Sequence, residues 1–500
     1  MIADSAKRSA WNGELRLLYA VFLFLTCCLA IQWTVASLAV GVLIGFSPLL
    51  VKRLWSFEVY LFVLILSLIL EKYSYYVGFS IRLPMIIILL TLPYIFCRAL
   101  VGCRLRLRIT PVYVFFFILL SIYVLGTIWA IEPIRVIRVS ILYLFLFALM
   151  FIAFELLNTE ERIRKAIDYL IWVGILGAVY GFYQVIAFVF GLQANLPFVE
   201  YLEHSRYYNT GLTVFEFAGN IVPRINSTFN DPVLIGAFTG MSLVLLLSKL
   251  SSQYATMSLT RLKLMVLVVG AFLLFLCVGL TFSRSSWIGL VIGLGVLGYY
   301  LLKIKLTRKI TVRIGLTTLM ATVLISAISP SVVESFVGRF FQSFDPSHRS
   351  TSDHLKWILV AVDAWVQNPL FGVGLNNYGE FFAQNYLASS HAMTHSAYFS
   401  FLAETGLIGF LVELSLIGVL INYLSRAISK VKRIGDRKWY FRLIGLLSAY
   451  LVLLGCNLTY HFYTQFYVWF FMGLVLAASE FVLHKVKADE AAPNRDMKCE

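Results

Sequence analysis

The stretch HAMTHSAYFSFLAETGLIG, residues 391–409, places His391 and His395 four residues apart at the start of a hydrophobic segment. Histidines at i and i+4 share one helix face and can bind one metal ion, as in H-E-x-x-H. Here Ala392 replaces the glutamate that acts as general base in that motif, and no third ligand is evident. A neutral histidine can instead accept a proton from an alcohol. A hydrogen-bonded residue at a helix N-terminus is the third alternative, and the spacing leaves all three open.

Two arginines lie beside apolar segments, where a charged side chain usually has an ion-pair partner or a functional role. Arg284, in TFSRSSWIGL, stands between two apolar runs with almost no loop, and a charge so close to hydrocarbon is costly. Arg224, in VPRINSTFNDP, precedes a helix-start signal of Asn, Asp and Pro. A guanidinium can bind a phosphate through two parallel hydrogen bonds. The alternatives are an arginine that extends to the membrane interface and a solvated loop charge.

The stretch NPLFGVGLNNYGEFF, residues 368–382, contains Gly372 and Gly374. It has no third glycine in register and no preceding strand, so we exclude a nucleotide-binding loop. Glycine permits backbone conformations that other residues avoid. We therefore expect a glycine-hinged turn in a binding loop.

Glu404 and Glu413 lie inside the hydrophobic segment that follows the two histidines. Acidic groups at such positions are expensive and tend to pair within a helix bundle. Glu404 is nine residues past His395, which corresponds to about 13 Å along a helix. We expect Glu404 to be structural, with an arginine as its candidate partner.

The composition is that of a membrane protein. Of the 500 residues, 60% are hydrophobic and 13% are charged, whereas soluble proteins are roughly half apolar and a quarter charged. A membrane span needs about 20 apolar residues, and applying that length predicts an all-α transmembrane bundle of about 12–14 spans. The predicted segments fall near 15–32, 34–51, 55–70, 83–100, 111–130, 139–157, 168–191, 232–250, 263–281, 286–302, 312–329, 397–424, 440–459 and 466–484.

The net charge of +15 is concentrated in short clusters between the apolar runs, so it predicts topology and not a nucleic-acid partner. Most of the 41 Lys and Arg residues fall in alternate loops and at both termini, which the positive-inside rule makes cytoplasmic. The two longest loops then lie on the outer face, which is periplasmic in a Gram-negative host. The seven cysteines contain no CxxC pair and indicate neither a disulfide framework nor a zinc ribbon.

This topology predicts six successive regions. They are N-terminal transmembrane helices (1–192), a first periplasmic loop (193–231), central transmembrane helices with the Ser-Arg turn (232–330), a large periplasmic loop with short helices (331–396), C-terminal transmembrane helices (397–485) and a cytoplasmic tail (486–500).

Together these stretches resemble the O-antigen ligase and O-antigen polymerase family of bacterial inner-membrane proteins. The ligase signature is His, then Asn, Ser or Gln, nine residues, and Gly-x-x-Gly. His395 and Ser396 are followed by nine residues and then by Gly406 and Gly409. The Ser-Arg turn, the Pro-Leu-x-Gly-x-Gly-x-x-Asn stretch and the arginine stretch before residue 232 are similar to other family motifs. The similarity covers about residues 220–415.

The resemblance implies a metal-independent, inverting glycosyltransferase with a GT-C-like fold and no cofactor. Its donor would be a glycan on undecaprenyl diphosphate, and its acceptor a hydroxyl of lipid A–core, of another lipid-linked repeat or of a protein. By motif match, His395 would be the base, and Arg284 and Arg224 would bind the diphosphate. The candidate acceptor or glycan contacts are His391, Arg339, Arg349, Asn376 and Asn377. The motif residues Ser396, Gly406, Gly409, Glu404, Gly372 and Gly374 would be structural.

Three functions remain as alternatives. The histidine motif favours the ligase, but two threonines that often follow it in the family are Phe410 and Leu411 here, so a polymerase stays open. A polysaccharide-lipid transporter without chemistry also fits many spans with charges inside the membrane, although we find no repeat of the kind that transporters often show. The third alternative is an outer-face metalloenzyme that uses both histidines.

Overall fold

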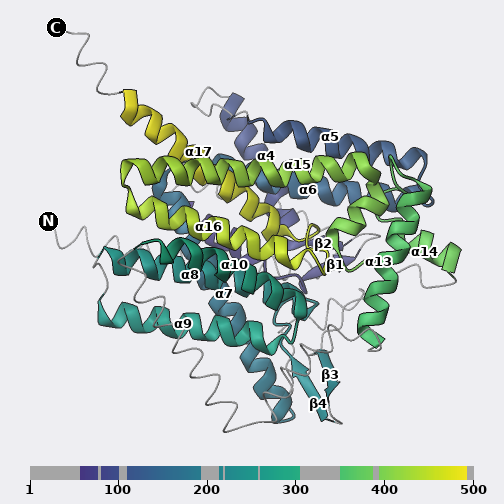
Figure 1. Ribbon diagram of the computed structural model, residues 1–500, viewed down its shortest axis with the longest axis horizontal. Helices are drawn as coiled ribbons and strands as arrows, with labels where there is room; N and C mark the ends of the chain where they lie inside the picture. Colours follow the sequence, from purple (N-terminus) through teal and green to yellow (C-terminus); the bar gives the residue numbers. More distant parts are fainter. Residues whose placement is uncertain are drawn as a thin grey trace.

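The computed structural model describes residues 57–76, 80–100, 108, 110–192, 213–217, 220–256, 260–304, 349–386 and 393–491 (Figure 1). Helices dominate these residues, as predicted. The helices are α3 (Phe57–Ser67), α4 (Leu83–Leu100), α5 (Val112–Leu125), the 3-10 turn η1 (Gly126–Ile128), α6 (Pro133–Leu156), α7 (Glu160–Val189), α8 (Pro232–Ala255), α9 (Arg261–Leu280), α10 (Arg284–Leu302), α13 (Arg349–Gln367), α14 (Tyr378–Tyr386), α15 (Ala397–Ile434), α16 (Arg437–Cys456) and α17 (Phe466–Ala491).

Two short antiparallel hairpins interrupt the helical pattern within these residues. One pairs β1 (Ser74–Tyr76) with β2 (Ser80–Arg82), and the other pairs β3 (Thr213–Phe217) with β4 (Asn220–Arg224). Both lie in loops that the sequence assigns to the outer face. A hairpin satisfies backbone hydrogen bonds within a loop, so the second one gives part of the first outer loop a fixed shape and ends at Arg224.

Eight of the described helices are long and apolar enough to cross a membrane, and three shorter apolar helices accompany them. Each predicted segment that falls on described residues coincides with one of these helices, which confirms the polytopic α-helical class. The predicted segments 15–32, 34–51 and 312–329 lie outside the described residues. The total of 12 or 14 spans therefore stays a prediction.

Most of the long helices run side by side along one direction, and α13 runs across their ends (Figure 1). Hydrogen bonds and ion pairs sort the loops into two ends of this bundle. One end joins Glu132 to Asn377, Ser285 to Thr459 and Glu71 to Gln465. The other end joins Lys249 to Asp168, Arg442 to Glu160 and Lys430 to Glu490. This sorting agrees with the predicted alternation of the loops.

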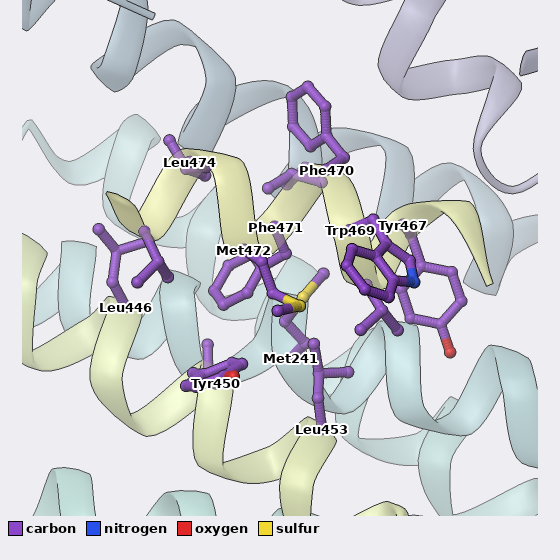
Figure 2. Close-up of a cluster of buried hydrophobic side chains, with 14 of the residues drawn as sticks. Met241, Leu446, Tyr450, Leu453, Tyr467, Trp469, Phe470, Phe471, Met472 and Leu474 are labelled. Carbon is purple, nitrogen blue, oxygen red and sulfur yellow. The ribbon is translucent and has the colours of Figure 1, made fainter. Parts of the chain in front are cut away.

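The centre of the bundle is built by α8, α16 and α17. Large apolar side chains from all three helices interdigitate there, including Met241, Leu453 and Met472 (Figure 2). Small residues let neighbouring helices approach more closely. A Cβ on Gly289 of α10 would lie 2.4 Å from Sγ of Cys456 on α16, and one on Gly236 of α8 would lie 2.3 Å from Oγ of Ser286. The start of α10 is thereby held tightly between α8 and α16.

Helix α15 is broken at Gly406, where φ is 64° and ψ is −169°. A broken helix at membrane depth must have its freed backbone groups satisfied by other protein groups. Backbone groups of the loop 369–374 form four hydrogen bonds with the freed backbone groups of α15. These are Val373 N–H to Ala403 C=O (3.0 Å), Gly374 N–H to Glu404 C=O (3.0 Å), Leu407 N–H to Pro369 C=O (2.9 Å) and Ile408 N–H to Leu370 C=O (3.2 Å).

The glycines of two sequence motifs meet at this break. A Cβ on Gly406 would lie 2.3 Å from the carbonyl of Leu370, and a Cβ on Gly372 would lie 2.4 Å from the carbonyl carbon of Glu404. Gly372 and Gly374 have φ values of 69° and 97°, so the expected glycine-hinged turn is present. Its partner is the backbone of α15, which the sequence did not indicate.

We expect Gly406→Ala to lower the stability of the protein by several kcal/mol. The Gly406 conformation is essentially restricted to glycine and costs other residues about 1–3 kcal/mol, and the clash with the Leu370 backbone adds to this. Gly418→Ala is the matched control on the same helix, since no atom lies within 4 Å of a Cβ there. Thermal unfolding of both purified variants measures the difference. Equal unfolding temperatures would contradict a rigidly packed break.

Candidate functional site

The loop of residues 457–465, between α16 and α17, holds several helix starts together at the end of the bundle where α13 lies. The backbone N–H of Ala397, the first residue of α15, donates to the carbonyl of Asn457 at 3.0 Å. Thr459 Oγ1 is 2.7 Å from Ser285 Oγ in the first turn of α10. Tyr460 donates its hydroxyl proton to Asp231, the N-cap of α8, at 3.2 Å. The N-termini of α8, α10, α15 and α17 therefore converge, and their partial positive charges favour an anion nearby.

His395 lies at this convergence, directly before α15. Its ring stacks on that of Trp357, with 4.4 Å between the ring centroids and 23° between the planes. The ring of His354 is 4.7 Å away and that of Tyr460 is 5.9 Å away. His354 and Trp357 both come from α13. The imidazole is therefore held by aromatic groups of two segments that are distant from it in sequence.

The backbone at His395 has a φ of 50°, in the left-handed region that few non-glycine residues adopt. A local turn fixes this conformation, because Thr394 Oγ1 donates to the carbonyl of Ser396 at 2.8 Å. The turn directs the chain into α15 immediately after the histidine. Ser396 is the N-cap of α15, and its side chain makes no capping hydrogen bond. Its hydroxyl is buried and has no hydrogen-bond partner within the described part of the chain.

The electrostatic environment keeps His395 neutral at neutral pH. Burial lowers the pKa of the imidazole below its ordinary value, and the carboxylate of Asp231 opposes this shift in part. Asp231 also accepts from the Val233 N–H at 2.8 Å, so its position is fixed. Burial raises the pKa of Tyr460 well above 10, and its phenol stays protonated as a donor to Asp231. A half-buried neutral imidazole with a carboxylate nearby can accept a proton and be stabilised once charged.

The pH profile of the activity is expected to follow this histidine. A base acts in its deprotonated form, so the rate should rise with pH through the His395 pKa, and the midpoint of the rise should lie below about pH 6.5. Asp231→Asn removes the charge that raises this pKa while keeping a good N-cap residue, so the rising limb should move to lower pH. Initial rates between about pH 4 and pH 8 test this, and a shift of the limb to higher pH would contradict it.

Both arginines are associated with the turn between α9 and α10. Arg224 Nε donates to the carbonyl of Thr281 at 2.9 Å, and the next residue, Ile225, donates its N–H to Leu280 at 3.1 Å. Arg284 follows three residues after Thr281 as the first residue of α10, behind the N-cap Ser283. Arg224 is also close enough to Tyr460 to influence its pKa. Both arginines thus belong to the same end of the bundle as the 457–465 loop.

The remaining predicted site residues are placed less directly or differently. His391 and Arg339 lie outside the described residues, and Arg349 begins α13 with its side chain not described. Asn376 is exposed, with a φ of 61°. Asn377 was expected as a candidate glycan contact, but its side chain is buried and its Oδ1 accepts from the backbone of Glu132 at 2.7 Å. Asn377 therefore joins two loops of the protein.

Glu404 has the structural position that the sequence predicted, with a different partner. Its carboxylate accepts from the backbone N–H groups of Asn376 and Tyr378, at 3.4 Å for Tyr378. Tyr378 begins α14, so the carboxylate caps that helix and replaces the expected arginine. Gly409 packs on Thr405, whose Oγ1 would be 2.2 Å from a Cβ at residue 409. Both residues support the break in α15.

Sequence reasoning missed the residues that surround His395. His354 and Trp357 stand three residues apart on α13, and Tyr460 stands next to His461 in the YHFYTQF stretch before α17. The polar and aromatic composition of this short stretch between two spans was the available signal. Burial lowers the pKa of His461 to about 4, and its ring packs against Phe401. His461 is therefore a neutral packing residue. Among the described residues, no group of three His, Cys, Asp or Glu side chains could hold a metal ion.

The chain is a polytopic α-helical membrane protein with a polar site at one end of its helix bundle. Residues 269–414 match the family model that is described as O-antigen ligase, so the resemblance to the O-antigen ligase and polymerase family is confirmed over these residues. No curated protein matches the chain. The matched segment contains Arg284, His395 and the break at Gly406, whereas Arg224 precedes it. A family of this kind supports glycan transfer as the general activity.

Proposed function

We propose that the protein is a membrane glycosyltransferase that moves a glycan from undecaprenyl diphosphate to an acceptor hydroxyl, with O-antigen ligation onto lipid A–core as its activity. The observation that carries the proposal is the position of His395. It is a half-buried neutral imidazole directly before α15, inside the matched O-antigen ligase segment and at the same end of the bundle as the turn of Arg284. The proposed location is the periplasmic face of the bacterial inner membrane, following the distribution of basic residues.

In the proposed reaction, groups of the protein accept the proton and stabilise each charge that develops. The imidazole of His395 accepts the proton of the acceptor hydroxyl as its oxygen bonds to the anomeric carbon. The bond from that carbon to the diphosphate oxygen breaks on the opposite side, and its electron pair leaves with undecaprenyl diphosphate, so the anomeric configuration inverts. Arg284, Arg224 and the converging helix N-termini stabilise the negative charge on the leaving group. Asp231 stabilises the imidazolium.

A polymerase is the second candidate, in which the acceptor is another lipid-linked repeat. It shares the donor, the base and the diphosphate site, and it differs only in the acceptor. The observation that keeps it open is the departure at Phe410 and Leu411, directly after the signature glycines. A lipopolysaccharide gel from a deletion host separates the two. Loss of a ligase leaves free polymer on the lipid carrier, whereas loss of a polymerase leaves core with a single repeat.

Two further alternatives are tested with purified protein. A polysaccharide-lipid transporter would move the donor without forming any new glycosidic bond, so a glycosylated acceptor in a detergent assay would reject it. A metalloenzyme that uses His391 and His395 would lose activity in a chelator and regain it with added divalent metal. Full activity after treatment with a chelator would reject that alternative.

A further inference from the structure

A polar cavity lies at the opposite end of the bundle from His395. It has a volume of about 250 Å³ and is formed by the first part of α7, the last part of α8 and the first part of α16. Helix α8 packs against both α7 and α16 in the bundle (Figure 1). Helix α8 has 24 residues, which corresponds to about 36 Å. Since α8 begins beside Tyr460 and its last turns line the cavity, the cavity is separate from the proposed active site.

The charge of this cavity is strongly positive. Its lining contains Arg164, Lys249, Lys438 and Arg442, against a single acidic residue, Asp168. The Asp168 carboxylate forms ion pairs with both Lys249 Nζ, at 2.7 Å, and Arg164 Nη1, at 3.8 Å. One carboxylate is therefore shared by two cations. Within the described part of the chain, Lys438 has no carboxylate partner within 4 Å.

Two carboxylates outside the lining contribute to the balance. Glu160, at the start of α7, binds Arg442 at 2.7 Å. Asp436, the N-cap of α16, binds Lys485 at 3.1 Å and also interacts electrostatically with Arg442. The four cations of the lining still outnumber Glu160, Asp436 and Asp168. The polar side chains of Ser248, Ser252, Gln253 and Thr256 also line the cavity, together with Ile167, Leu245 and Gly445. The excess of cationic side chains in this polar cavity matches an anion that offers several acceptor oxygens, as phosphate does.

The position of the cavity indicates where the anion comes from. The cavity lies where three spanning helices begin or end, which is the headgroup level of a bilayer. This end carries the basic clusters that the positive-inside rule assigns to the cytoplasm. Basic pockets between transmembrane helices on that side bind the headgroups of anionic lipids. A volume of 250 Å³ is below the range of about 300–1,000 Å³ of sites that enclose whole ligands, and so fits a headgroup alone.

We infer that this cavity, formed by α7, α8 and α16, is a binding site for a phosphate group, presented by the headgroup of an anionic phospholipid. The lipid tails would lie along the outside of the bundle while the phosphate contacts Arg164 and Lys438. The site links α7 to α8 and α16, and the other ends of α8 and α16 adjoin the proposed active site. Its occupancy therefore stabilises the folded bundle.

The test is thermal unfolding of the purified full-length protein in an uncharged detergent, with increasing phosphatidylglycerol. We expect the lipid to raise the unfolding temperature with saturation. In an Arg164→Gln/Lys438→Gln variant the half-saturating concentration should rise by about 25-fold, or fivefold for each charge removed. Arg164 is about half exposed and Lys438 is exposed, so the variant should fold. Lys438→Gln alone should show the fivefold change.

Three comparisons decide the outcome. Lys432→Gln/Arg433→Gln removes two exposed charges at the same end, outside the cavity lining, and should respond to the lipid as wild type does. Saturation by inorganic phosphate alone, lost in the cavity variant, would support the site and identify soluble phosphate as its source. Equal weakening in both double variants, or equal stabilisation by zwitterionic phosphatidylcholine, would overturn the inference.

Discussion

His395→Asn is expected to reduce glycan transfer by about 10²–10⁴-fold, the usual contribution of a general base. Asparagine is the sharper substitution because it tolerates the left-handed backbone at this position, where φ is 50°. Alanine removes the same base but adds a conformational cost. The loss should appear in kcat, with little change in donor binding, because proton transfer contributes only in the transition state. Initial rates with a lipid-linked donor and a purified acceptor measure it.

The control for His395 is His484→Asn, at an exposed position near the end of α17. It removes an imidazole of the same chain at the opposite end of the bundle, and it should leave transfer unchanged. Both variants should reach the membrane at the abundance of wild type. Normal transfer by a His395→Asn protein of normal abundance would show that the histidine is structural, and the transporter alternative would then gain support.

Arg284→Ala is expected to lower kcat by about 10²–10³-fold, the effect of removing one preorganised group that stabilises developing charge. Arg284→Lys should recover only part of this loss, since an ammonium cannot form the two parallel hydrogen bonds of a guanidinium. Arg224→Ala should have a similar effect, although Arg224 also holds the turn at Thr281 through its Nε. If both arginines bind one diphosphate, the double variant should lose less than the product of the single losses.

The chain offers a close control for Arg284. Arg261 is the first residue of α9, as Arg284 is the first residue of α10, and it is exposed at the other end of the bundle. Arg261→Ala should therefore keep wild-type transfer. A parallel loss in both variants would mean that arginine at a helix start supports folding or insertion, and the diphosphate role would be wrong.

The helices were predictable from sequence because an apolar run of sufficient length has few alternatives in a membrane. The main difference is in α15, predicted over 397–424 and observed to Ile434, since its basic last turns remain helical after the apolar run ends. His395 could be found because its motif is local. Trp357 and Tyr460 could not, because they reach the histidine only through the docking of α13 and the 457–465 loop.

The glycine motifs illustrate the same limit. Gly372 and Gly406 both have positive φ values, which glycine adopts readily because it has no side chain. The sequence predicted a turn at Gly372. Each glycine also contacts the segment that contains the other. This tertiary contact could not be predicted from the local sequence. The position of Asn377 shows the same limit, because its partner Glu132 is more than two hundred residues earlier in the chain.

The break in α15 also sets an order for the assembly of the protein in the membrane. The part of α15 after Gly406 has 28 of its 38 residues, about 42 Å of helix, which is sufficient to cross a bilayer alone. The part before Gly406 can therefore remain outside the lipid during insertion. Its missing backbone partners lie in residues 369–374, which are synthesised earlier. The docking loop is therefore synthesised before the helix that needs it, and the end of the bundle that holds His395 can assemble as soon as α15 has crossed the membrane.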